Sequence, residues 1–337
     1  MSLPEINVCP GTLAEGFSSY SPSYLKNLFG GKKVSHILPF PSPGTSEEAT
    51  ELFIENRKRI SISGVQEKLS LILEDNRLRL TKPGENGTYI LKPIPRDIRK
   101  VGIVPANEHL TMQIARQVYK INIAENALIF FEDGPPAYIT KRFDFHNDGR
   151  KRGKEDFASL ANKTIDNAGE NFKYEYSYEE MGQLIQRFVP AWKIEIEKYF
   201  AMVVFNFLFS NGDAHLKNFS LLETSNGDYI LSPAYDLMNT RLHVTDVDFA
   251  MEKGLFADDF KSEIYRNRLH PGKADFMEFG RRIGVIESRI EKVLTPFLER
   301  QEGVENLINR SFLDETSKRS YLMSYQQRRN TLNAEQK

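Results

Sequence analysis

The sequence predicts an α+β protein with two lobes, of which the first is rich in β-strands and carries one main helix, and the second is mostly helical. Three observations lead to this prediction. Residues 60–143 hold several short segments in which apolar and polar residues alternate, as they do in half-buried strands. A segment at 107–118 has apolar residues at helical spacing instead. Beyond residue 144 the helical spacing dominates, so we expect the lobes to comprise residues 1–143 and 144–337.

The first lobe is expected to hold an antiparallel meander. A turn at residues 74–76 separates two alternating segments, and a second turn at 132–135 separates two more. Asn107 is a plausible N-cap for the one helix between them. The expected strands are residues 69–73, 77–81, 89–93, 127–131 and 137–143.

The second lobe is expected to be built around a buried helix. Ser177 and Glu180 form a capping-box pattern that predicts a helix to about Phe188. Residues 194–210 are apolar most of the way round a helix, as in a core helix, and Asn211 and Gly212 are expected to end it. Short strands at 219–222 and 229–231 and further helices at 259–333 complete the prediction.

The bulk composition is that of an ordinary globular protein. The chain has 337 residues, of which 40% are hydrophobic and 27% charged, and a net charge of −1. A charge near zero gives no reason to expect nucleic acid or an anionic membrane as the main partner. The single cysteine, Cys9, excludes a disulfide within the chain and fits a reducing compartment. No signal peptide is visible, and we expect a soluble cytoplasmic protein without membrane contact.

Three polar residues that follow the expected buried helix in the sequence suggest a chemical function. Asp213 and Asn218 lie five residues apart in one polar loop, and Asp236 follows the expected hairpin. Phosphoryl transfer from ATP needs one carboxylate to orient the acceptor hydroxyl and take its proton. It also needs oxygen ligands for Mg²⁺, which an Asn and a second Asp supply. Asp213 is therefore the candidate base, and Asn218 and Asp236 are the candidate metal ligands, although Asp and Asn are also ordinary turn formers.

Two residues of the first lobe strengthen this hypothesis. Lys92 ends an expected strand, where a lysine can contact the α- and β-phosphates of ATP. Glu108, in the helix after Asn107, is the best candidate for the acid that holds this lysine. Taken singly, Lys92 is more simply explained as a surface lysine at a strand end, and Glu108 as an acid near a helix N-terminus. The loop of residues 61–68 contains one glycine and could cradle phosphate with its backbone amides.

Several other sites are not supported. There is no G-x-G-x-x-G and no Walker A sequence, so neither a dinucleotide fold nor a P-loop is indicated. The six histidines show no pair at metal-ligand spacing, and a zinc site would lack thiolates. A G-x-S-x-G elbow for hydrolase chemistry is also missing.

At this point a resemblance to a known family becomes visible. The residues concerned follow one another in family order across about residues 60–240, and the loop that contains Asp213 is the most specific of them. Together they resemble the HipA-like serine/threonine kinases of bacterial toxin–antitoxin modules, and the Asp-x-His-x-x-Asn arrangement is also similar to that of phosphatidylinositol-type kinases. The segments that carry the resemblance are 61–68, 90–93, 107–108, 142–144, 211–219 and 233–236.

The resemblance implies a two-lobed protein-kinase-like fold and a set of functional residues. It implies the roles given above for Asp213, Asn218 and Asp236, places Lys92 on ATP, and makes residues 139–143 the segment that contacts adenine. It also implies autophosphorylation at Ser61 or Ser63. Besides Lys92 and Glu108, the residues expected to bind ATP are Ser63, Gly64, Val65, Thr140, Lys141, Phe143, His215, Lys217 and Tyr235.

One departure from the family pattern bears on the partners. Full-length members carry an extra N-terminal subdomain of about a hundred residues before the serine loop, whereas only sixty residues precede Ser61 here. The chain therefore resembles the short, HipT-like form, in which a separate small protein supplies the missing subdomain. An antitoxin is the other partner implied, and DNA would be reached only indirectly, through that antitoxin.

The resulting functional prediction is a toxin kinase that uses ATP and Mg²⁺. Its implied substrate is a protein of translation such as an aminoacyl-tRNA synthetase, and autophosphorylation at Ser61 or Ser63 would limit its activity. Two alternatives remain open. One is a small-molecule or lipid kinase with the same three residues, and the other is a non-catalytic subunit of a repressor complex.

Overall fold

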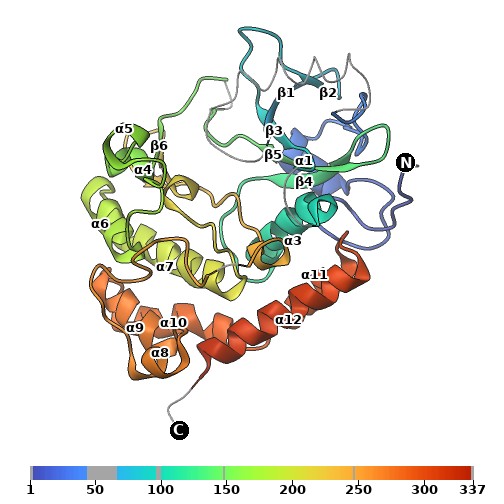
Figure 1. Ribbon diagram of the computed structural model, residues 1–337. Helices are drawn as coiled ribbons and strands as arrows, with labels where there is room; N and C mark the ends of the chain where they lie inside the picture. The colour runs from blue at the N-terminus through green and yellow to red at the C-terminus, as the bar shows by residue number, and fades with distance from the viewer. Residues whose placement is uncertain (1–2, 44–66, 96–99, 147–148, 246, 335–337) are drawn as a thin grey trace. The chain divides into compact units, whose positions relative to one another are not determined.

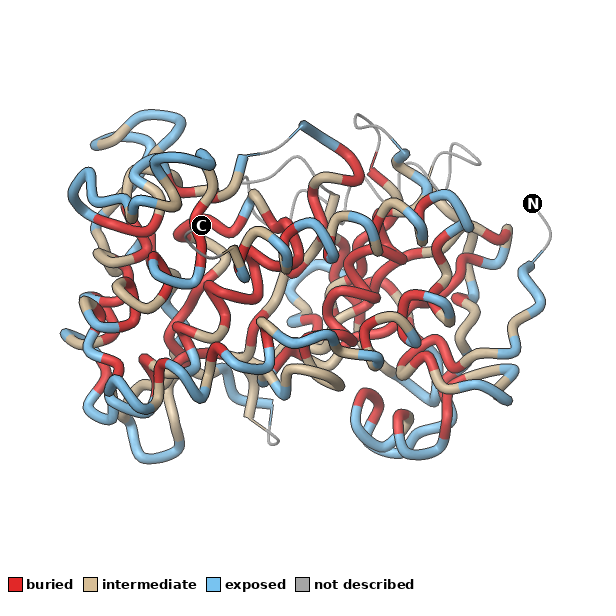
Figure 2. Tube along the Cα trace, turned by 90° about the horizontal axis from the view of Figure 1, so that it is seen from below, coloured by how far each residue is buried: buried red, intermediate tan, exposed pale blue. Residues whose placement is uncertain are grey.

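The chain divides into two compact units. The computed structural model describes residues 3–43, 67–95, 100–146, 149–245 and 247–334. The first unit comprises Met1–Gln113, Ala124–Phe143 and Asn306–Lys318 (Figure 1). The second comprises Ile114–Ile123, Asp144–Glu305 and Arg319–Lys337. Exposed stretches are concentrated in the outer loops of the trace (Figure 2).

The first unit is built on an antiparallel sheet, as predicted. Each predicted strand is present within two residues of its expected bounds. A short helix near the N-terminus, α1, was not predicted. The elements are α1 (Pro22–Phe29), β1 (Leu69–Glu74), β2 (Arg77–Leu80), β3 (Tyr89–Lys92), the 3₁₀ turn η1 (Val101–Ile103), α3 (Val104–Gln117), β4 (Asn126–Phe130) and β5 (Pro136–Lys141).

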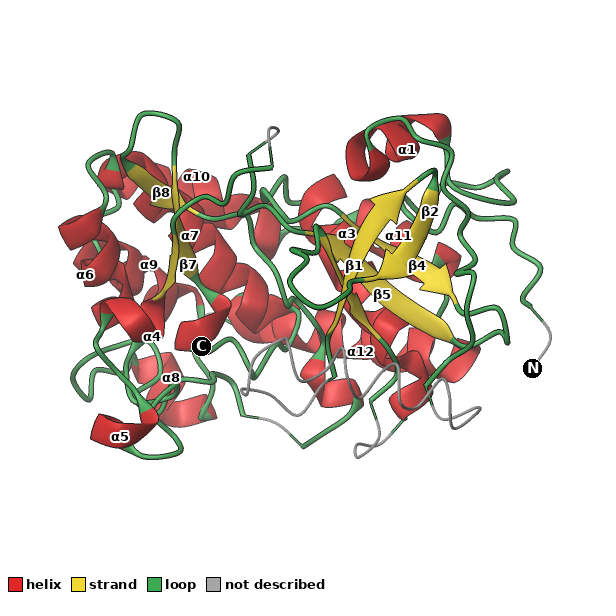
Figure 3. Cartoon of the chain, turned by 90° about the horizontal axis from the view of Figure 1, so that it is seen from above, coloured by secondary structure: helices red, strands yellow, loops and turns green. Residues whose placement is uncertain are grey.

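The strand order corrects the expected meander. The strands pair in the order β2-β1-β3-β5-β4, so that β3 lies beside β1 and not beside β2. Figure 3 shows this sheet, with β1, β2, β4 and β5 labelled. Strand β2 carries Arg77 and Arg79 and forms an edge, where charged side chains reach water and discourage further strand pairing. Strand β3 is mostly buried and therefore occupies the middle of the sheet.

The two faces of this sheet differ in what they hold. Leu71, Leu91 and Ile139 belong to one buried cluster with Tyr24 and Leu28 of α1. Because side chains alternate along a strand, Lys92 points away from this cluster to the opposite face. Its strand position therefore sends a lysine into the side of the sheet that α3 covers.

Helix α3 begins earlier than predicted. It starts at Val104, so Asn107 is a residue of the first turn and not the N-cap, and Glu108 lies just beyond that turn. Pro105 explains the difference, because the first turn of a helix tolerates a proline that its interior would not.

The second unit is mostly helical, with a small sheet of order β6-β7-β8. Strand β6 was not predicted, since the surrounding sequence reads as a charged loop. The elements are β6 (Lys154–Asp156), α4 (Phe157–Leu160), α5 (Ile165–Ala168), α6 (Tyr178–Phe188), α7 (Trp192–Leu208), η2 (Leu216–Asn218), β7 (Ser220–Glu223), β8 (Tyr229–Leu231), η3 (Thr240–Leu242), α8 (Glu263–Arg268), α9 (Lys273–Arg282), α10 (Glu287–Leu298), α11 (Glu302–Arg310) and α12 (Glu315–Leu332), with α11 and α12 shared between the units.

Helix α7 is the buried centre of this unit, as its composition predicts. It packs against α6 and α10, and its aromatic residues Tyr199 and Phe205 have no exposed surface. Both rings contact other aromatic rings, as Phe205 does with Phe209. Such pairs contribute about 1 kcal/mol each beyond the burial of their area. The helix ends at Leu208, two residues before its predicted end, and Ser210 follows with a left-handed φ of 53°. None of the helices among the described residues combines the length and apolar character that crossing a membrane requires.

Helix α6 confirms the predicted capping box. The Ser177 hydroxyl accepts a hydrogen bond from the Glu180 amide at 3.1 Å, and the Glu180 carboxylate accepts one from the Ser177 amide at 2.8 Å. Ser177 has no exposed surface, so water cannot replace this bond.

We therefore expect Ser177→Ala to lower the free energy of unfolding by about 1 kcal/mol, because it leaves the first turn of α6 with an unsatisfied amide. Urea unfolding followed by circular dichroism measures this loss. Ser225→Ala, in an exposed turn, is the control and should leave the midpoint unchanged. Equal midpoints for the two variants would contradict the role of the cap.

Candidate active site

The loop that follows α7 presents an exposed carboxylate. The Asp213 side chain is 56% exposed. One of its oxygens, Oδ1, accepts a hydrogen bond of 2.9 Å from the Tyr174 hydroxyl, and the His215 Nε2 lies 3.9 Å from the same oxygen. The Tyr174 and His215 rings meet edge to face, with centroids 5.2 Å apart. These contacts fix the carboxylate while leaving it open to water.

His215 is a neutral residue in this arrangement. It is 7% exposed. Burial lowers the pKa of the imidazole to about 4, and Lys173 acts in the same direction, whereas Asp213 opposes the shift. Removal from water is the largest of these causes, so a neutral ring stands beside Asp213 at neutral pH.

Two buried polar atoms of this loop have no hydrogen-bond partner among the described residues. They are the amide oxygen of Asn218 and the Nδ1 of His215. A buried acceptor without a partner costs about 1–3 kcal/mol, so native proteins rarely retain one without a ligand to satisfy it. Asn218 is one of the two predicted metal ligands.

Asp236 sits in a strained backbone position. Its φ is 57°, in the left-handed region that residues other than glycine seldom occupy. The side-chain amide of Asn211 donates to the Asp236 carbonyl at 3.4 Å and to the Asn206 side-chain oxygen at 2.9 Å. Asn211 thus connects α7, the Asp213 loop and the Asp236 loop. Sequence reasoning missed this role, although Asn206 is the only polar residue in the apolar run 201–209.

A second anchor was also missed. The Thr240 hydroxyl donates to the Ser210 carbonyl at 2.9 Å and accepts from the Gly212 amide at 2.9 Å. The Thr240 amide donates to the same carbonyl at 3.0 Å. A threonine thirty residues away gives no local signal of this contact, so only the fold reveals it.

Two further predicted residues are held by the same unit. Lys217 forms an ion pair of 2.7 Å with Asp156, the N-cap of α4. The Tyr235 hydroxyl donates to the Lys217 carbonyl at 2.9 Å and lies 2.5 Å from the Ser220 hydroxyl. Burial raises the pKa of Tyr235, so its hydroxyl stays protonated. Both side chains therefore stabilise the loop through contacts within the protein.

The donor atoms fit a hard divalent cation. Among the described residues, no three His, Cys, Asp or Glu side chains gather into a metal cluster. Mg²⁺ does not require one, because it keeps several waters and accepts one or two protein oxygens. The unpartnered Asn218 oxygen and the Asp236 carboxylate are oxygens of the right chemistry.

The first unit holds the predicted lysine–glutamate pair. The Lys92 ammonium lies 2.6 Å from a Glu108 carboxylate oxygen, and the exposed fractions of the side chains are 4% and 3%. The same ammonium lies 5.3 Å from the centre of the Tyr138 ring, on the neighbouring strand. Buried charges require such partners, since an isolated ammonium would lose its hydration without compensation.

The other predicted residues of the first unit lie on or next to β5. The Thr140 hydroxyl and the Lys141 amide both donate to the Glu125 carbonyl, at 3.0 and 2.8 Å. Phe143 is half-buried and is the last residue of the segment Ala124–Phe143 of the first unit. Ser61, Ser63, Gly64 and Val65 lie outside the described residues.

Comparison with known proteins gives a family match and relatives. The model of the HipA-like C-terminal domain matches residues 60–303. A putative kinase of Haemophilus influenzae is 27% identical over 95% of this chain and 94% of its own length. The putative kinase Y4dM of Sinorhizobium fredii is 30% identical over 62% of this chain and 52% of its own length.

Two solved structures share the fold. A chain of the HipA, HipB and operator DNA complex of Shewanella oneidensis matches with a TM-score of 0.63 at 21% identity, over 88% of this chain and 73% of the other. The Helicobacter pylori proinflammatory kinase CtkA matches with a TM-score of 0.51 at 18% identity, over 81% and 92%. The predicted kinase-like α+β fold is thereby confirmed.

The neutral state of His215 predicts how stability depends on pH. In the folded chain the pKa of His215 is about 4, whereas an unfolded histidine titrates near about 6.5. On acidification through this window the unfolded chain takes up a proton that the folded chain does not. The free energy of unfolding should therefore fall by about 2 kcal/mol between about pH 7.5 and pH 5.

Urea unfolding of the wild type and of His215→Gln across this pH range isolates the contribution of His215. The free energy of unfolding of the variant should not show this part of the dependence on pH. The variant also assigns the His215 signal in a nuclear magnetic resonance titration. A measured His215 pKa near that of an unfolded histidine would contradict the prediction.

Proposed function

Because the chain belongs to the HipA-like C-terminal domain family, we propose that it is an ATP-dependent serine/threonine protein kinase and the toxin of a toxin–antitoxin module. One observation carries this proposal. The loop after α7 combines the exposed, oriented Asp213 carboxylate with the buried, unpartnered Asn218 oxygen. A general base and a metal ligand are the groups that phosphoryl transfer requires of such a loop.

Asp213 acts as the base in this proposal. Its Oδ1 is held by Tyr174, and its exposed side chain is open to the hydroxyl of a protein serine or threonine. As the acceptor oxygen bonds to the γ-phosphorus, the bond to the oxygen that bridges the β- and γ-phosphates breaks. The hydroxyl proton passes to Asp213, and ADP leaves. Neutral His215 avoids placing a cation beside the base that would weaken its basicity.

Asn218 and Asp236 would hold Mg²⁺ through their side-chain oxygens. The bound ion would neutralise the charge of the ATP phosphates. Asn211 fixes the backbone of Asp236, and this contact orients the second ligand.

The remaining residues bind the nucleotide in this proposal. Lys92 contacts the α- and β-phosphates, and Glu108 fixes the direction of its ammonium, as the 2.6 Å ion pair supports. Thr140, Lys141 and Phe143 contact adenine. His215, Lys217 and Tyr235 complete the site on the catalytic loop, and Ser63, Gly64 and Val65 cover the phosphates.

The biological role is proposed from the relatives. The solved relative of Shewanella oneidensis is a HipA toxin–antitoxin complex with HipB and operator DNA. By analogy we assign this chain an antitoxin partner, contact with DNA only through that antitoxin, and a protein substrate of translation such as an aminoacyl-tRNA synthetase. A small protein that supplies a further N-terminal subdomain, as in HipT-like systems, is the second proposed partner.

The replacement Asp213→Asn tests the catalytic proposal. It keeps the size and the Tyr174 contact but removes the base, so we expect phosphate transfer from Mg-ATP to protein to fall at least about 100-fold. Transfer is measured with radiolabelled ATP on the purified chain and on cell extract. Asp259→Asn changes an exposed acid of the same unit and should retain full activity.

The outcomes also separate the alternatives. Transfer to a lipid headgroup or a small molecule, with none to protein, would identify a kinase of another substrate class. Nucleotide binding without transfer to any acceptor would identify a non-catalytic subunit.

Autophosphorylation is tested separately. Incubation with Mg-ATP should add phosphate at Ser61 or Ser63, located by mass spectrometry, and Asp213→Asn should add none. Each phosphate brings nearly two negative charges into a segment that must approach the ATP phosphates, so the modified chain should bind ATP more weakly. The double variant Ser61→Ala, Ser63→Ala should stay unmodified, whereas the control Ser225→Ala should be modified like the wild type. Unmodified serines in an active wild type would refute self-limitation.

A further inference from the structure

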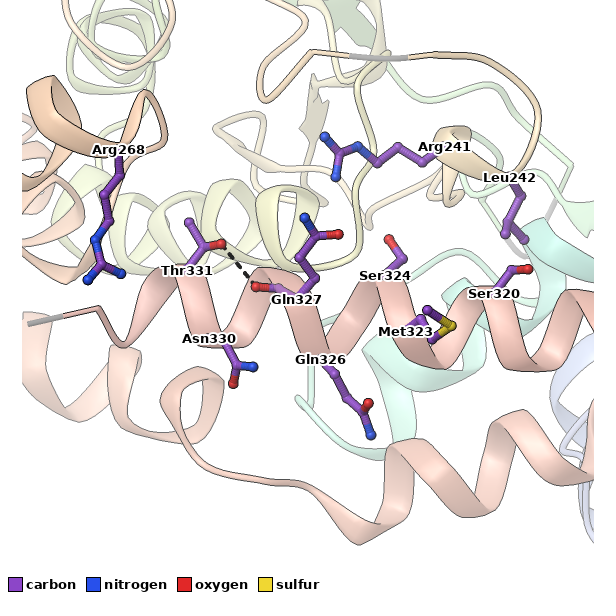
Figure 4. Close-up of a pocket in the computed structure, with 10 residues that line it drawn as sticks. All are labelled: Arg241, Leu242, Arg268, Ser320, Met323, Ser324, Gln326, Gln327, Asn330 and Thr331. Atoms are coloured by element: carbon purple, nitrogen blue, oxygen red, sulfur yellow. Dashed lines mark hydrogen bonds between the residues drawn. The ribbon is translucent and has the colours of Figure 1, made fainter.

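One groove of the second unit lies outside the residues assigned to phosphoryl transfer. It runs along α12 and has a volume of about 740 Å³. Its floor includes Ser324, Gln327 and Thr331. In Figure 4, Arg268 lies beside the Thr331 end of this row, and the Arg241 side chain extends over it towards Gln327. We call it the α12 groove.

The α12 groove carries uncompensated positive charge. None of its ten lining residues is acidic. Within the described part of the chain, neither the Arg241 nor the Arg268 side chain has a hydrogen bond or an ion pair with another residue. Arg289 of the same unit, by contrast, is paired with Glu197 at 2.6 Å. The groove therefore offers two guanidinium groups to an outside anion.

The length of the floor indicates an extended ligand. Ser320 and Thr331 both line the groove and lie eleven positions apart on α12. At a rise of 1.5 Å per residue this is about 16 Å. An extended peptide covers that distance with about five residues. The Gln327 amide, which has no side-chain partner among the described residues, can bond to the backbone of such a peptide.

The groove also offers apolar contact. Met323, 69% exposed, and Leu242, 9% exposed, both line it. A methionine adapts to varied apolar partners, so an apolar peptide side chain can pack there, at the end of the groove away from Arg268.

The floor of the groove is bonded to the catalytic loop. The Ser324 and Ser210 hydroxyls lie 3.0 Å apart, and Ser210 precedes Asp213 by three residues. Arg328, one turn further along α12, donates to the Ser210 hydroxyl at 3.2 Å and is ion-paired with Asp248. Arg241 directly follows Thr240, which holds the Gly212 amide. Whatever fills the groove therefore touches the supports of that loop.

We propose that the α12 groove binds an extended acidic peptide segment of a partner protein and that its occupation restrains the Asp213 loop. A nucleic-acid duplex fits less well. Leu242 and the exposed Met323 line the groove, and a continuous row of phosphates would make no apolar contact with them. This proposal does not depend on the proposed kinase activity.

Fluorescence anisotropy tests the binding without nucleotide. The probe is a labelled nine-residue peptide in which glutamate alternates with leucine, and its twin carries glutamine for every glutamate. We expect the acidic probe to bind, and to bind more weakly as salt rises to about 0.5 M. The glutamine twin, Arg241→Ala and Arg268→Ala should each weaken binding at least tenfold. Arg266→Ala, an exposed arginine of α8 that does not line the groove, should not.

Three results would overturn the proposal. They are no anisotropy change up to about 1 mM peptide, an equal loss in Arg266→Ala, and tighter binding of a labelled DNA duplex with the same dependence on Arg241 and Arg268.

Hydrogen exchange measures the coupling between the α12 groove and the Asp213 loop. Bound probe should slow exchange of the 210–218 amides in the wild type but not in Arg241→Ala, and unchanged exchange with bound probe would refute the coupling.

Discussion

The exit of helix α7 is the constraint on which the candidate site depends. A helix buried on nearly every side must release its last carbonyl groups into a protein interior, where water cannot satisfy them. Ser210 turns the chain with a left-handed φ, and Thr240 satisfies its carbonyl twice while also holding the Gly212 amide. The Ser210 and Asn211 amides also donate to the α7 carbonyls of Phe207 and Asn206, so the three residues that precede the exposed Asp213 are held both by the helix and by Thr240.

The Asp213 loop and the Asp236 loop concentrate free-energy costs that purely structural turns would avoid. Among the described residues, Asn218 and His215 each keep a buried polar atom without a partner, and Asp236 occupies a left-handed backbone position. Each costs on the order of 1–3 kcal/mol. The aromatic core around α7 offsets such costs through packing, including the contacts of Tyr199 and Phe219 with Phe157. Costs of this kind cluster where a ligand, rather than the fold, uses the groups concerned.

The sequence predicts what depends on local pattern and fails where distant residues decide. Alternation located the strands, and the Ser177 capping box located α6. The order of the strands was wrong because alternation shows which residues face the core but not which strand is central. The start of α3 was wrong because Asn107 was taken as the N-cap, whereas the helix begins three residues earlier, at Val104. The Lys92–Glu108 contact was predicted from chemistry. Asn206 is marked in the sequence only as a polar residue in an apolar run, and the Thr240 anchor has no local pattern at all.

Basic residues occur in two environments in this chain, and the difference distinguishes the candidate nucleotide site from the α12 groove. Lys92 is buried, so its charge is tolerable only with Glu108 beside it, and that pair is already complete before any nucleotide arrives. Arg241 and Arg268 keep contact with water and have no partner among the described residues, so an incoming carboxylate replaces solvent rather than an internal bond. Ser324 joins their groove to Ser210, ahead of the loop that presents Asp213. Any effect of a groove ligand on nucleotide binding must then be matched by an equal effect of nucleotide on the groove ligand, because coupling free energy between two sites is reciprocal.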